Sequence, residues 1–284
     1  MINDPDQLRD RMAAQGYLAG DGLAEAAYLS LKLERPLFLE GDPGVGKTDF
    51  ARKLAGALGR AYVRLQCHSG LDAAQALYEW NFPQQILALR SVDSPSRREE
   101  LLEQLYDRKF LLRRPILRAL QDGPAVLLID EIDRADDEFE AVLLQVLEDY
   151  EITIPELADP IPAAVKPIVV LTSNRTREVH DALKRRCLYY WIDHPKPDQE
   201  EHILRVRVQG LSERLAREIA EGMGRVRDDP KVTKAPGVAE ALDFASALVA
   251  RDFGGLDEKS VRATVTTLAK DHADRDRIIR RLLP

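Results

Sequence analysis

The sequence predicts an α/β fold in which a mainly parallel sheet is followed by a small all-helical region. Two apolar runs, Ala125–Ile129 and Ile168–Thr172, are short enough to be strands buried on both faces, as in parallel sheets. Helical spacing of apolar residues occurs between them, at Phe139–Leu147. After residue 197 no strand-like run is long enough to predict, and only helical segments remain.

The first predicted elements flank a glycine-rich turn. Residues before Leu31 carry apolar side chains at helical spacing. Pro36–Glu40 is an apolar run typical of a short buried strand, and Asp49–Leu58 has helical spacing again. Ala61–Leu65 alternates between apolar and polar residues, which predicts another strand.

Three segments are expected to project from this layer or to lie at its edge. Gly70–Leu89 contains bulky aromatic residues and a proline, and we expect it to leave the sheet as a helical or hairpin insertion. The charged stretch Arg97–Glu100 is predicted to open another helix, whose start carries Ser94 before Pro95 as N-cap and first-turn residues. Glu151–Pro167 has four prolines, which predicts an exposed β-hairpin or a long loop.

The alternation of strands and helices ends at the proline-broken segment Asp193–Pro197. Helical segments are predicted after it at residues 200–208, 212–222, 238–251 and 258–271. We therefore expect two domains, an α/β domain over residues 1–197 and an all-helical domain over residues 198–284.

The composition is that of an ordinary globular protein, with 45% hydrophobic and 31% charged residues among 284. No apolar run has membrane-spanning length and Met1–Asp4 does not open a signal peptide, so we expect a cytoplasmic protein with no membrane partner. The formal net charge of −7 argues against nucleic acid as the main partner, because such binding depends on positive surface. Cys67 and Cys187 are too few for disulfides or zinc and are expected to be buried, and the five histidines lack metal-ligand spacing.

One glycine-rich stretch fits the pattern G-x-x-x-x-G-K-[ST] between a predicted strand and a predicted helix. In such a turn, backbone N–H groups and a helix N-terminus surround a phosphate. The lysine reaches the β- and γ-phosphates, and the threonine hydroxyl is a Mg²⁺ ligand. A surface turn without a ligand is the alternative, but both flanking elements fit the phosphate loop. The predicted binding residues are Gly41, Asp42, Pro43, Gly44, Val45, Gly46, Lys47, Thr48 and the adjoining Asp49.

Two acids, Asp130 and Glu131, follow the apolar run at Ala125–Ile129. Carboxylates at the carboxyl end of a parallel strand face the crevice where ligands bind. We expect Asp130 to hold the metal through water and Glu131 to polarise the attacking water for hydrolysis. Asp133 either adds to the outer shell of the metal or is structural.

Asn174 follows the next buried strand. Its neutral amide can hydrogen-bond the γ-phosphate or the lytic water. The alternative is that Ser173 or Asn174 caps the following helix.

Arg185 and Arg186 lie at the end of that predicted helix. Basic residues in a last turn complement the helix dipole. The other interpretation is an arginine finger that reaches the nucleotide of a neighbouring subunit and neutralises charge in the transition state.

Together these motifs resemble those of AAA+ ATPases. Leu128–Ala135 and Val170–Arg175 are similar to the MoxR branch, while Asp181–Trp191 and Ala235–Glu240 look like CoxD-type proteins within it. The resemblance covers almost the whole chain. It implies an αβα nucleotide-binding domain with P-loop, followed by a small helical lid, with ATP and Mg²⁺ as cofactors.

The family pattern also implies roles for individual residues. Asn174 matches sensor 1, Arg185 or Arg186 matches the finger, and Tyr17-Leu18 falls where the family wraps the adenine. The segments 71–89 and 151–167 match insertions that face the pore of family hexamers. One departure is that Val238 stands where relatives often have a sensor-2 arginine; Lys234 or Arg225 would then substitute, or the lid contributes less to sensing.

The resemblance implies an ATP-driven remodelling chaperone that forms a hexameric ring and acts on a protein client. For CoxD-like members it implies maturation or metal-cofactor insertion of a molybdenum-containing carbon monoxide dehydrogenase-like enzyme, together with a von Willebrand A domain partner. The alternatives are a nucleic-acid motor, a chelatase-type motor subunit and an ATP-binding switch without turnover. Residues 71–89 contain two acids and no lysine or arginine, which disfavours nucleic acid, and Lys47, Asp130 and Glu131 together disfavour the switch.

Overall fold

A computed structural model describes residues 2–91, 101–102 and 104–283. The chain divides into two compact units. The first comprises Met1–Ala24, Glu40–Lys53 and Trp191–Pro284, and the second comprises Glu25–Leu39 and Leu54–Tyr190. The expected start of the helix that residues 97–100 open, with Ser94 and Pro95, lies outside the described residues.

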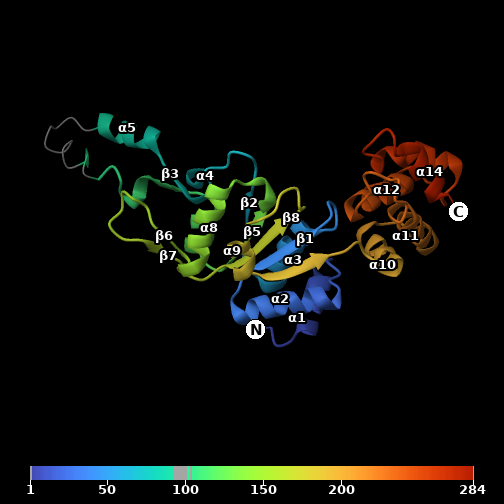
Figure 1. Cartoon of the computed structure of the whole chain (residues 1–284), viewed down its shortest axis with the longest axis horizontal. Helices are drawn as coiled ribbons and strands as arrows, with labels where there is room; N and C mark the ends of the chain where they lie inside the picture. The colour runs from blue at the N-terminus through green and yellow to red at the C-terminus, as the bar shows by residue number, and fades with distance from the viewer. Residues whose placement is uncertain (1, 92–100, 103, 284) are drawn as a thin grey trace. The chain divides into compact units, whose positions relative to one another are not determined.

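Five strands form one sheet in the order β2-β5-β8-β1-β9, which confirms the predicted α/β class (Figure 1). β2 pairs with β5 and β5 with β8 in parallel, and Gln66 lies opposite Asp130. All six residues of β5 are buried, as expected for a central parallel strand. β9 was not predicted. The strands are β1 (Leu37–Gly41), β2 (Ala61–Gln66), β5 (Ala125–Asp130), β8 (Ile168–Ser173) and β9 (Leu188–Ile192).

Helices of the second unit pack on this sheet around one apolar core. In α8, Asp136 caps the N-terminus by accepting a hydrogen bond from Phe139 N at 2.9 Å. Phe139, Leu143 and Leu147 then recur on the buried face. The helices of this region are α2 (Asp21–Leu33), α3 (Lys47–Leu58), α7 (Pro115–Gln121), α8 (Asp137–Asp149) and α9 (Asp181–Arg186), of which α2 and α3 begin in the first unit.

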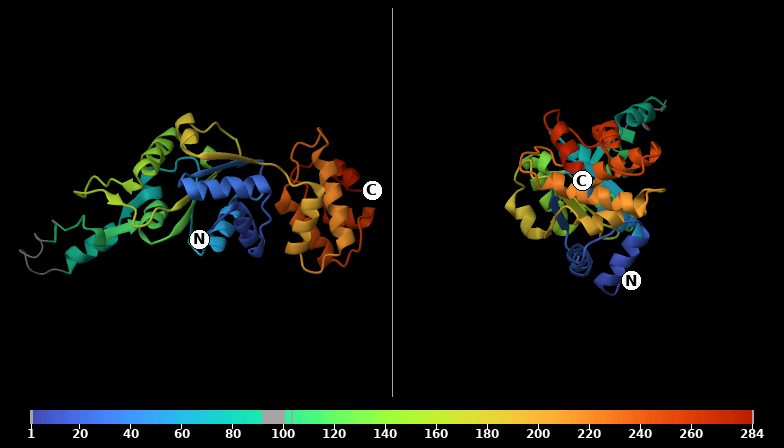
Figure 2. Two further views of the ribbon diagram at one scale, coloured as in Figure 1. Left: turned by 90° about the horizontal axis from the view of Figure 1, so that it is seen from below. Right: turned by 90° about the vertical axis from the view of Figure 1, so that its right-hand side faces the viewer.

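Both predicted insertions are present. The first contains α4 (Ala73–Leu77), β3 (Tyr78–Trp80) and α5 (Phe82–Arg90), and β3 pairs antiparallel with β4 (Leu111–Arg113). α5 lies away from the sheet strands (Figure 2).

The second insertion is a short hairpin of β6 (Glu151–Ile152) and β7 (Ile161–Pro162). The expectation of an exposed hairpin is wrong in one respect, because Ile152, Ile154 and Ile161 are buried in the core. The alternation of Ile152 and Ile154 places them on one face of the segment, which packs inward.

The C-terminal part of the first unit is helical, as expected, and has its own core of residues between Leu204 and Leu282. The expected helix at 258–271 is shorter and is followed by a 3₁₀ turn at Val265–Thr267, and α14 was not predicted. The helices of this unit are α1 (Pro5–Ala14), α10 (Pro197–Arg207), α11 (Glu213–Arg227), α12 (Val238–Ala250), α13 (Glu258–Thr264) and α14 (Arg275–Leu282).

A buried ion pair connects α10 and α11 within this helical part. Arg227 donates to both carboxylate oxygens of Glu200 at 2.6 and 2.7 Å, and the two side chains are 9% and 1% exposed. Burial raises the pKa of Glu200, which the hydrogen bond and charge of Arg227 oppose. Arg227 Nε also donates to Pro236 O at 2.8 Å, so the pair fixes the segment that leads into α12.

Cys67 and Cys187 are both buried and unbridged, as predicted. Burial raises the pKa of each thiol to about 12, and for Cys67 the charge of Asp130 adds to the shift. Among the described residues, no helix combines the length and apolar character needed to cross a bilayer.

Candidate functional site

The phosphate-loop pattern joins β1 to α3. Gly44 and Gly46 have φ angles of 82° and 93°, left-handed values that glycine adopts without a steric penalty. The buried Lys47 ammonium donates hydrogen bonds to Gly41 O at 2.6 Å and Asp42 O at 2.8 Å, so its side chain lies across the loop. A glycine turn at a helix N-terminus, spanned by a lysine, fits the shape and charge of a phosphate.

Tyr17 and Leu18 lie in the same unit, before α2. The Tyr17 ring meets Phe50 of α3 edge-on, with centroids 5.6 Å apart. A Cβ atom added to Gly46 would lie 3.7 Å from the Tyr17 ring. The structure therefore places Tyr17 beside the phosphate loop, with half-buried Leu18 next to it in the chain.

Asp49, in the first turn of α3, is held by an arginine of α10. Arg207 Nη1 donates to Asp49 Oδ2 at 2.9 Å and to Gly16 O at 3.3 Å. Asp49 is therefore paired with α10 in this structure, and Arg207 joins three segments that are distant in the sequence.

His194 also contacts the loop, with Nε2 3.5 Å from Asp42 Oδ2. Burial lowers the pKa of His194, and the positive charge of Arg227 lowers it further. Burial therefore favours the neutral form of the imidazole, which weakens any ion pair with Asp42. Its buried Nδ1 has no hydrogen-bond partner among the described residues.

The start of α12 contacts the phosphate loop directly. Val238 N and Ala239 N donate to Gly44 O at 3.0 and 3.4 Å. Gly237 approaches so closely that a Cβ on it would lie 2.7 Å from Gly44 Cα. The first N–H groups of a helix need acceptors, and a carbonyl of the loop supplies one here.

The two residues considered as sensor-2 substitutes are engaged elsewhere in the helical part. Lys234 Nζ lies 3.8 Å from Asp271. Arg225 donates to Arg281 O at 2.9 Å and to Leu282 O at 3.2 Å. Backbone N–H groups of α12, rather than either of these side chains, contact Gly44.

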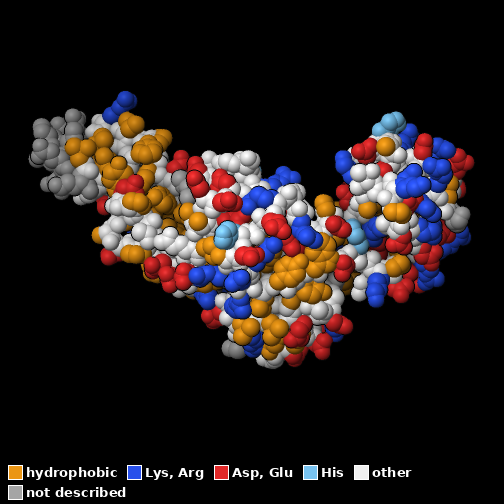
Figure 3. Space-filling view, in the orientation of Figure 1, with side chains coloured by type: hydrophobic (Ala, Val, Ile, Leu, Met, Phe, Trp, Pro, Cys, Tyr) orange, Lys and Arg blue, Asp and Glu red, His pale blue; other side chains and the backbone are white. Residues whose placement is uncertain are grey.

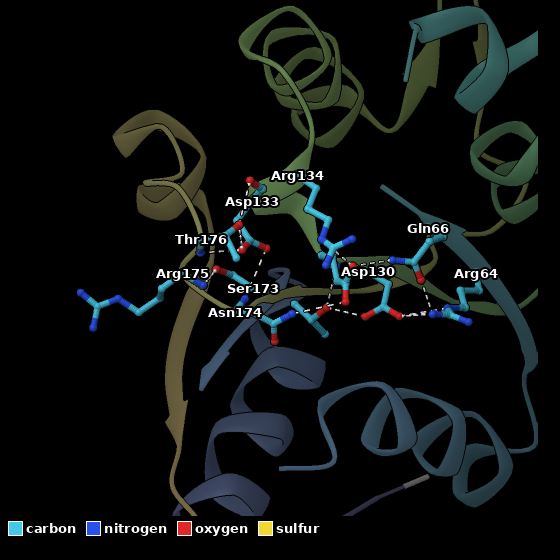
Figure 4. A network of polar contacts seen from close by, with 11 residues as sticks. Arg64, Gln66, Asp130, Asp133, Arg134, Ser173, Asn174, Arg175 and Thr176 are labelled. Carbon is cyan, nitrogen blue, oxygen red and sulfur yellow. Dashed lines mark hydrogen bonds and ion pairs between the residues drawn. The ribbon is translucent and has the colours of Figure 1, made fainter. Parts of the chain in front are cut away.

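The second unit brings Asp130 together with two donors at the carboxyl end of β5 (Figure 4). Asp130 is 2% exposed. Its Oδ1 accepts from Thr172 Oγ1 at 2.5 Å, and its Oδ2 accepts from Arg64 Nε at 2.9 Å and Nη2 at 2.5 Å. Both carboxylate oxygens are therefore hydrogen-bonded by neighbouring strands.

Glu131 has a left-handed backbone, with φ 56° and ψ 50°. For a residue other than glycine this costs on the order of 1–3 kcal/mol. Its N–H donates to Thr172 Oγ1 at 2.9 Å. Its carboxylate accepts from Gln66 Nε2 at 3.1 Å and Asn174 Nδ2 at 3.3 Å, and Arg134 Nε lies 2.9 Å away. These contacts from β2, the segment after β8 and the turn after β5 fix the half-buried carboxylate.

Asp133 is a structural residue that supports the segment after β8. It is 3% exposed and accepts from Asn174 N at 3.3 Å, Thr176 N at 2.8 Å and Thr176 Oγ1 at 2.6 Å. These bonds occupy its oxygens with donors of that segment.

The capping alternative for Ser173 and Asn174 is wrong. The next helix, α9, begins at Asp181, and its N-cap is His180. Ser173 Oγ instead accepts from Arg175 N at 3.0 Å, within the segment after β8. Asn174, which follows β8, donates from Nδ2 to Glu131 Oε1 at 3.3 Å and is therefore held beside that carboxylate.

Arg185 and Arg186 form the last turn of α9, where basic residues also complement the helix dipole. Arg185 is exposed, whereas Arg186 Nη2 pairs with Glu148 at 3.1 Å. Arg35 donates to the carbonyls of Arg185 at 2.7 Å and of Arg186 and Cys187 at 3.2 Å each. The end of α9 is therefore fixed by an arginine from a distant segment.

No group of three or more His, Cys, Asp or Glu side chains in the described part of the chain is placed to hold a metal ion. Magnesium in nucleotide sites usually keeps several waters and takes one or two protein ligands plus phosphate oxygens.

Sequence reasoning missed the residues that hold these side chains. Arg64 and Gln66 come from β2, and their role depends on the register that places Gln66 opposite Asp130. Arg207 bonds to Asp49, which lies 158 residues earlier in the sequence, and Arg35 bonds to Arg185, which lies 150 residues later. A weak signal exists only for β2, where Arg64 and Gln66 are two apart and share one face.

Comparison with known proteins agrees with this description. The profile of the AAA domain (dynein-related subfamily) matches residues 36–187. Protein NorQ of Paracoccus denitrificans is 24% identical over 242 residues, which cover 83% of this chain and 81% of that protein. An uncharacterized protein of Staphylococcus haemolyticus is 21% identical over 256 residues, covering 87% of this chain and 89% of the other.

Among solved structures, the RuvB Holliday junction branch migration motor of Thermotoga maritima is similar over 94% of this chain and 70% of its own. The TM-score is 0.47 and the identity 16%. The structure of a proline-to-glycine mutant of the same motor gives a TM-score of 0.49 with 16% identity, over 95% of this chain and 72% of that one.

The matched AAA profile spans more than half of the chain and includes the phosphate loop, both acids at the end of β5, Asn174 and α9. The chain therefore belongs to the AAA ATPases, with an AAA domain of the dynein-related subfamily.

Proposed function

We propose that this protein hydrolyses ATP to ADP and phosphate. The observation that supports hydrolysis, rather than binding alone, is the set of contacts that fix the Glu131 carboxylate beside Asn174. In this proposal, Lys47 and the loop of residues 41–48 hold the phosphates, with Asp49, Tyr17 and Leu18 alongside. Thr48 and Asp130 would hold Mg²⁺, which neutralises phosphate charge when bound. Glu131 would orient and polarise the water, and Asn174 would hydrogen-bond the γ-phosphate or that water.

We also propose that the subunits form a hexameric ring, as AAA ATPases commonly form rings, and that the end of α9 acts across its interface. Exposed Arg185 is suited to reach another subunit, while Arg186 is held by Glu148. A guanidinium supplied by a neighbour would neutralise charge on the transferred phosphoryl group. Residues 1–197 would form the nucleotide-binding domain and residues 198–284 the lid, in a cytoplasmic protein.

Mixing two inactive variants tests the shared site. A variant with Arg185→Ala and Arg186→Ala keeps Glu131, and a Glu131→Gln variant keeps both arginines. Mixed rings can contain interfaces that pair an intact Glu131 with an intact arginine, so phosphate release is expected to reappear on mixing and to be greatest near equal amounts. The absence of any activity at all mixing ratios would instead support the helix-capping role of these arginines.

The client that we propose is a protein, and the enzyme is of the MoxR type. The exposed apolar side chains of α5, Phe82, Ile86 and Leu87, are 55%, 51% and 68% exposed. Figure 3 shows hydrophobic side chains gathered over this helix. An exposed apolar patch is a common mark of a protein-binding surface, whereas nucleic acid would require basic residues. The insertion is therefore better suited to a polypeptide.

Within the MoxR type we propose a CoxD-like role: maturation or metal-cofactor insertion of a molybdenum-containing carbon monoxide dehydrogenase-like enzyme, with a von Willebrand A domain partner. The motifs at Asp181–Trp191 and Ala235–Glu240 support this assignment. The likeness to NorQ over most of both chains supports the broader MoxR placement.

Capture of the client tests this part of the proposal. The Glu131→Gln protein, purified from its own cells in ATP, is expected to retain a molybdenum hydroxylase and a von Willebrand A protein. Adding Phe82→Ser and Leu87→Ser should reduce that recovery by about tenfold, since apolar contacts at the centre of an interface carry most of its energy. Leu33→Ser, at a side chain 57% exposed on α2, is the matched control and should retain the client. Recovery of nucleic acid in place of these proteins would contradict the assignment.

A further inference from the structure

Arg64 forms an ion pair with Asp130, the carboxylate that we propose as a metal ligand. Its guanidinium donates two hydrogen bonds to Asp130 Oδ2, at 2.9 and 2.5 Å, while Thr172 occupies Oδ1. Asp130 therefore has no carboxylate oxygen left without a donor, and its negative charge is already paired. A metal-binding carboxylate held in this way needs an explanation beyond the roles assigned above.

The strand register explains how Arg64 reaches Asp130. On β2, Arg64 lies opposite Leu128 and Gln66 lies opposite Asp130. Residues two apart in a strand share a face, so the long Arg64 side chain runs along β2 toward the end of β5. Arg64 Nη2 also donates to Gln66 Oε1, and Gln66 in turn donates to Glu131 (Figure 4). Arg64 thus stands at the end of a polar chain that touches both acids.

The two partners differ in their access to water. The Asp130 side chain is 3% exposed, whereas the Arg64 side chain is 42% exposed and lies on an edge strand of the sheet. Arg64 can therefore leave the carboxylate for solvent with little loss of hydration, but Asp130 cannot leave its position. A guanidinium is always protonated, so the positive charge is present at every working pH.

We propose that Arg64 gates the metal site by competing with Mg²⁺ for Asp130. In the structure described here it neutralises the carboxylate, and Mg²⁺ has to displace it or share its partner. Two cations on one buried carboxylate repel each other, so Arg64 weakens metal binding until nucleotide phosphates supply further negative charge. This inference rests on the proposed nucleotide site. It makes Arg64 a positioning residue, because it acts through Asp130.

The competing explanation is that Arg64 only compensates a buried charge and stabilises the fold. Both roles predict some loss of stability when Arg64 is removed. They differ in the metal: a purely structural arginine leaves the Mg²⁺ affinity unchanged or makes it weaker when it is removed, since Asp130 becomes less ordered. Removal of a competing arginine makes Mg²⁺ bind more tightly.

Magnesium titration of the full chain separates these roles. A fluorescent ATP analogue that reports binding is held at a fixed concentration with Arg64→Gln protein, and Mg²⁺ is added after chelation. We expect the Mg²⁺ midpoint to fall by about tenfold relative to the unsubstituted protein, while affinity for the analogue in excess chelator changes less than about threefold. Arg113→Gln is the matched control, because Arg113 forms an exposed pair with Asp122. Its midpoint should not move.

Arg64→Lys provides a second measurement, needed if the glutamine variant does not fold. Lysine keeps the charge but lacks the two-pronged fork, so the midpoint should fall by about two- to threefold. A folded Arg64→Gln protein whose midpoint is unchanged or higher overturns the proposal, as does an unchanged Arg64→Lys midpoint where only that variant folds. Failure of the unsubstituted protein to bind the analogue would overturn the nucleotide site itself, a result distinct from either of these.

Discussion

Replacing Glu131 by glutamine is expected to lower ATP turnover by about 10²–10⁴-fold while ATP remains bound. The substitution replaces one carboxylate oxygen by an amide NH2 group, so the side chain can no longer accept a proton from water. Gln66 and Asn174 hydrogen-bond this side chain in the structure, and Arg134 lies 2.9 Å away. An amide is nearly the same shape, and if its NH2 group faces Asn174, a flip of the Asn174 amide lets Oδ1 accept that hydrogen bond, so the side chain can stay in place while the chemistry is lost.

Two measurements separate chemistry from binding: phosphate release under saturating ATP, and equilibrium binding of a fluorescent ATP analogue. Glu138→Gln makes the same chemical change at an exposed position in the first turn of α8 and should leave both values unchanged. Turnover of the Glu131→Gln protein within a few-fold of the unsubstituted protein would remove Glu131 from the reaction.

The parts of the fold that could be predicted are those with a local signal. β5 and β8 are short apolar runs because both faces are covered, and that burial is visible in composition alone. The phosphate loop is equally local, since glycine, lysine and threonine act within eight consecutive residues. Glu131 follows β5 directly, so its place at a strand end could be inferred without knowing the topology.

Two of the missed elements, β9 and α14, do carry a local signal. β9 is a run of five apolar or aromatic residues, and in α14 the buried Ile278, Ile279 and Leu282 lie at helical spacing among charged residues. The hairpin at 151–162 was predicted as exposed because of its prolines, but its isoleucines pack in the core. Burial there depends on the rest of the molecule, which proline content does not report.

The residues of the candidate site also divide into those with a local sequence signal and those without one. Lys47, Asp130 and Asn174 could be proposed as site residues because each belongs to a motif. Their partners could not, because Arg64 bonds to Asp130 only through the pairing of β2 with β5. The charge on Arg64 is visible in the sequence, but the carboxylate it neutralises is 66 residues away.

Replacing Lys47 by alanine is expected to weaken nucleotide binding by at least about 100-fold, which corresponds to about 2.7 kcal/mol. Lys47 is 7% exposed and bonds to the carbonyls of Gly41 and Asp42, so the ammonium lies within the loop. Charged hydrogen bonds contribute about 1.5–3 kcal/mol each, and the loss of those to the β- and γ-phosphates accounts for the effect. The same change also leaves two loop carbonyls without their donor, so the loop itself loses support.

Equilibrium titration with a fluorescent ATP analogue measures this loss, and thermal unfolding shows whether the chain stays folded. Lys53→Ala, on the same helix but outside the glycine turn, removes an equal charge and should change affinity by less than about threefold, because water and salt screen a charge that does not contact the phosphates. The contrast between these two lysines isolates the position of Lys47 from its charge. If Lys47→Ala binds the analogue within a few-fold of the unsubstituted protein, the loop does not hold phosphate through this ammonium, and the roles assigned to Asp130, Glu131 and Arg64 lose their common ligand.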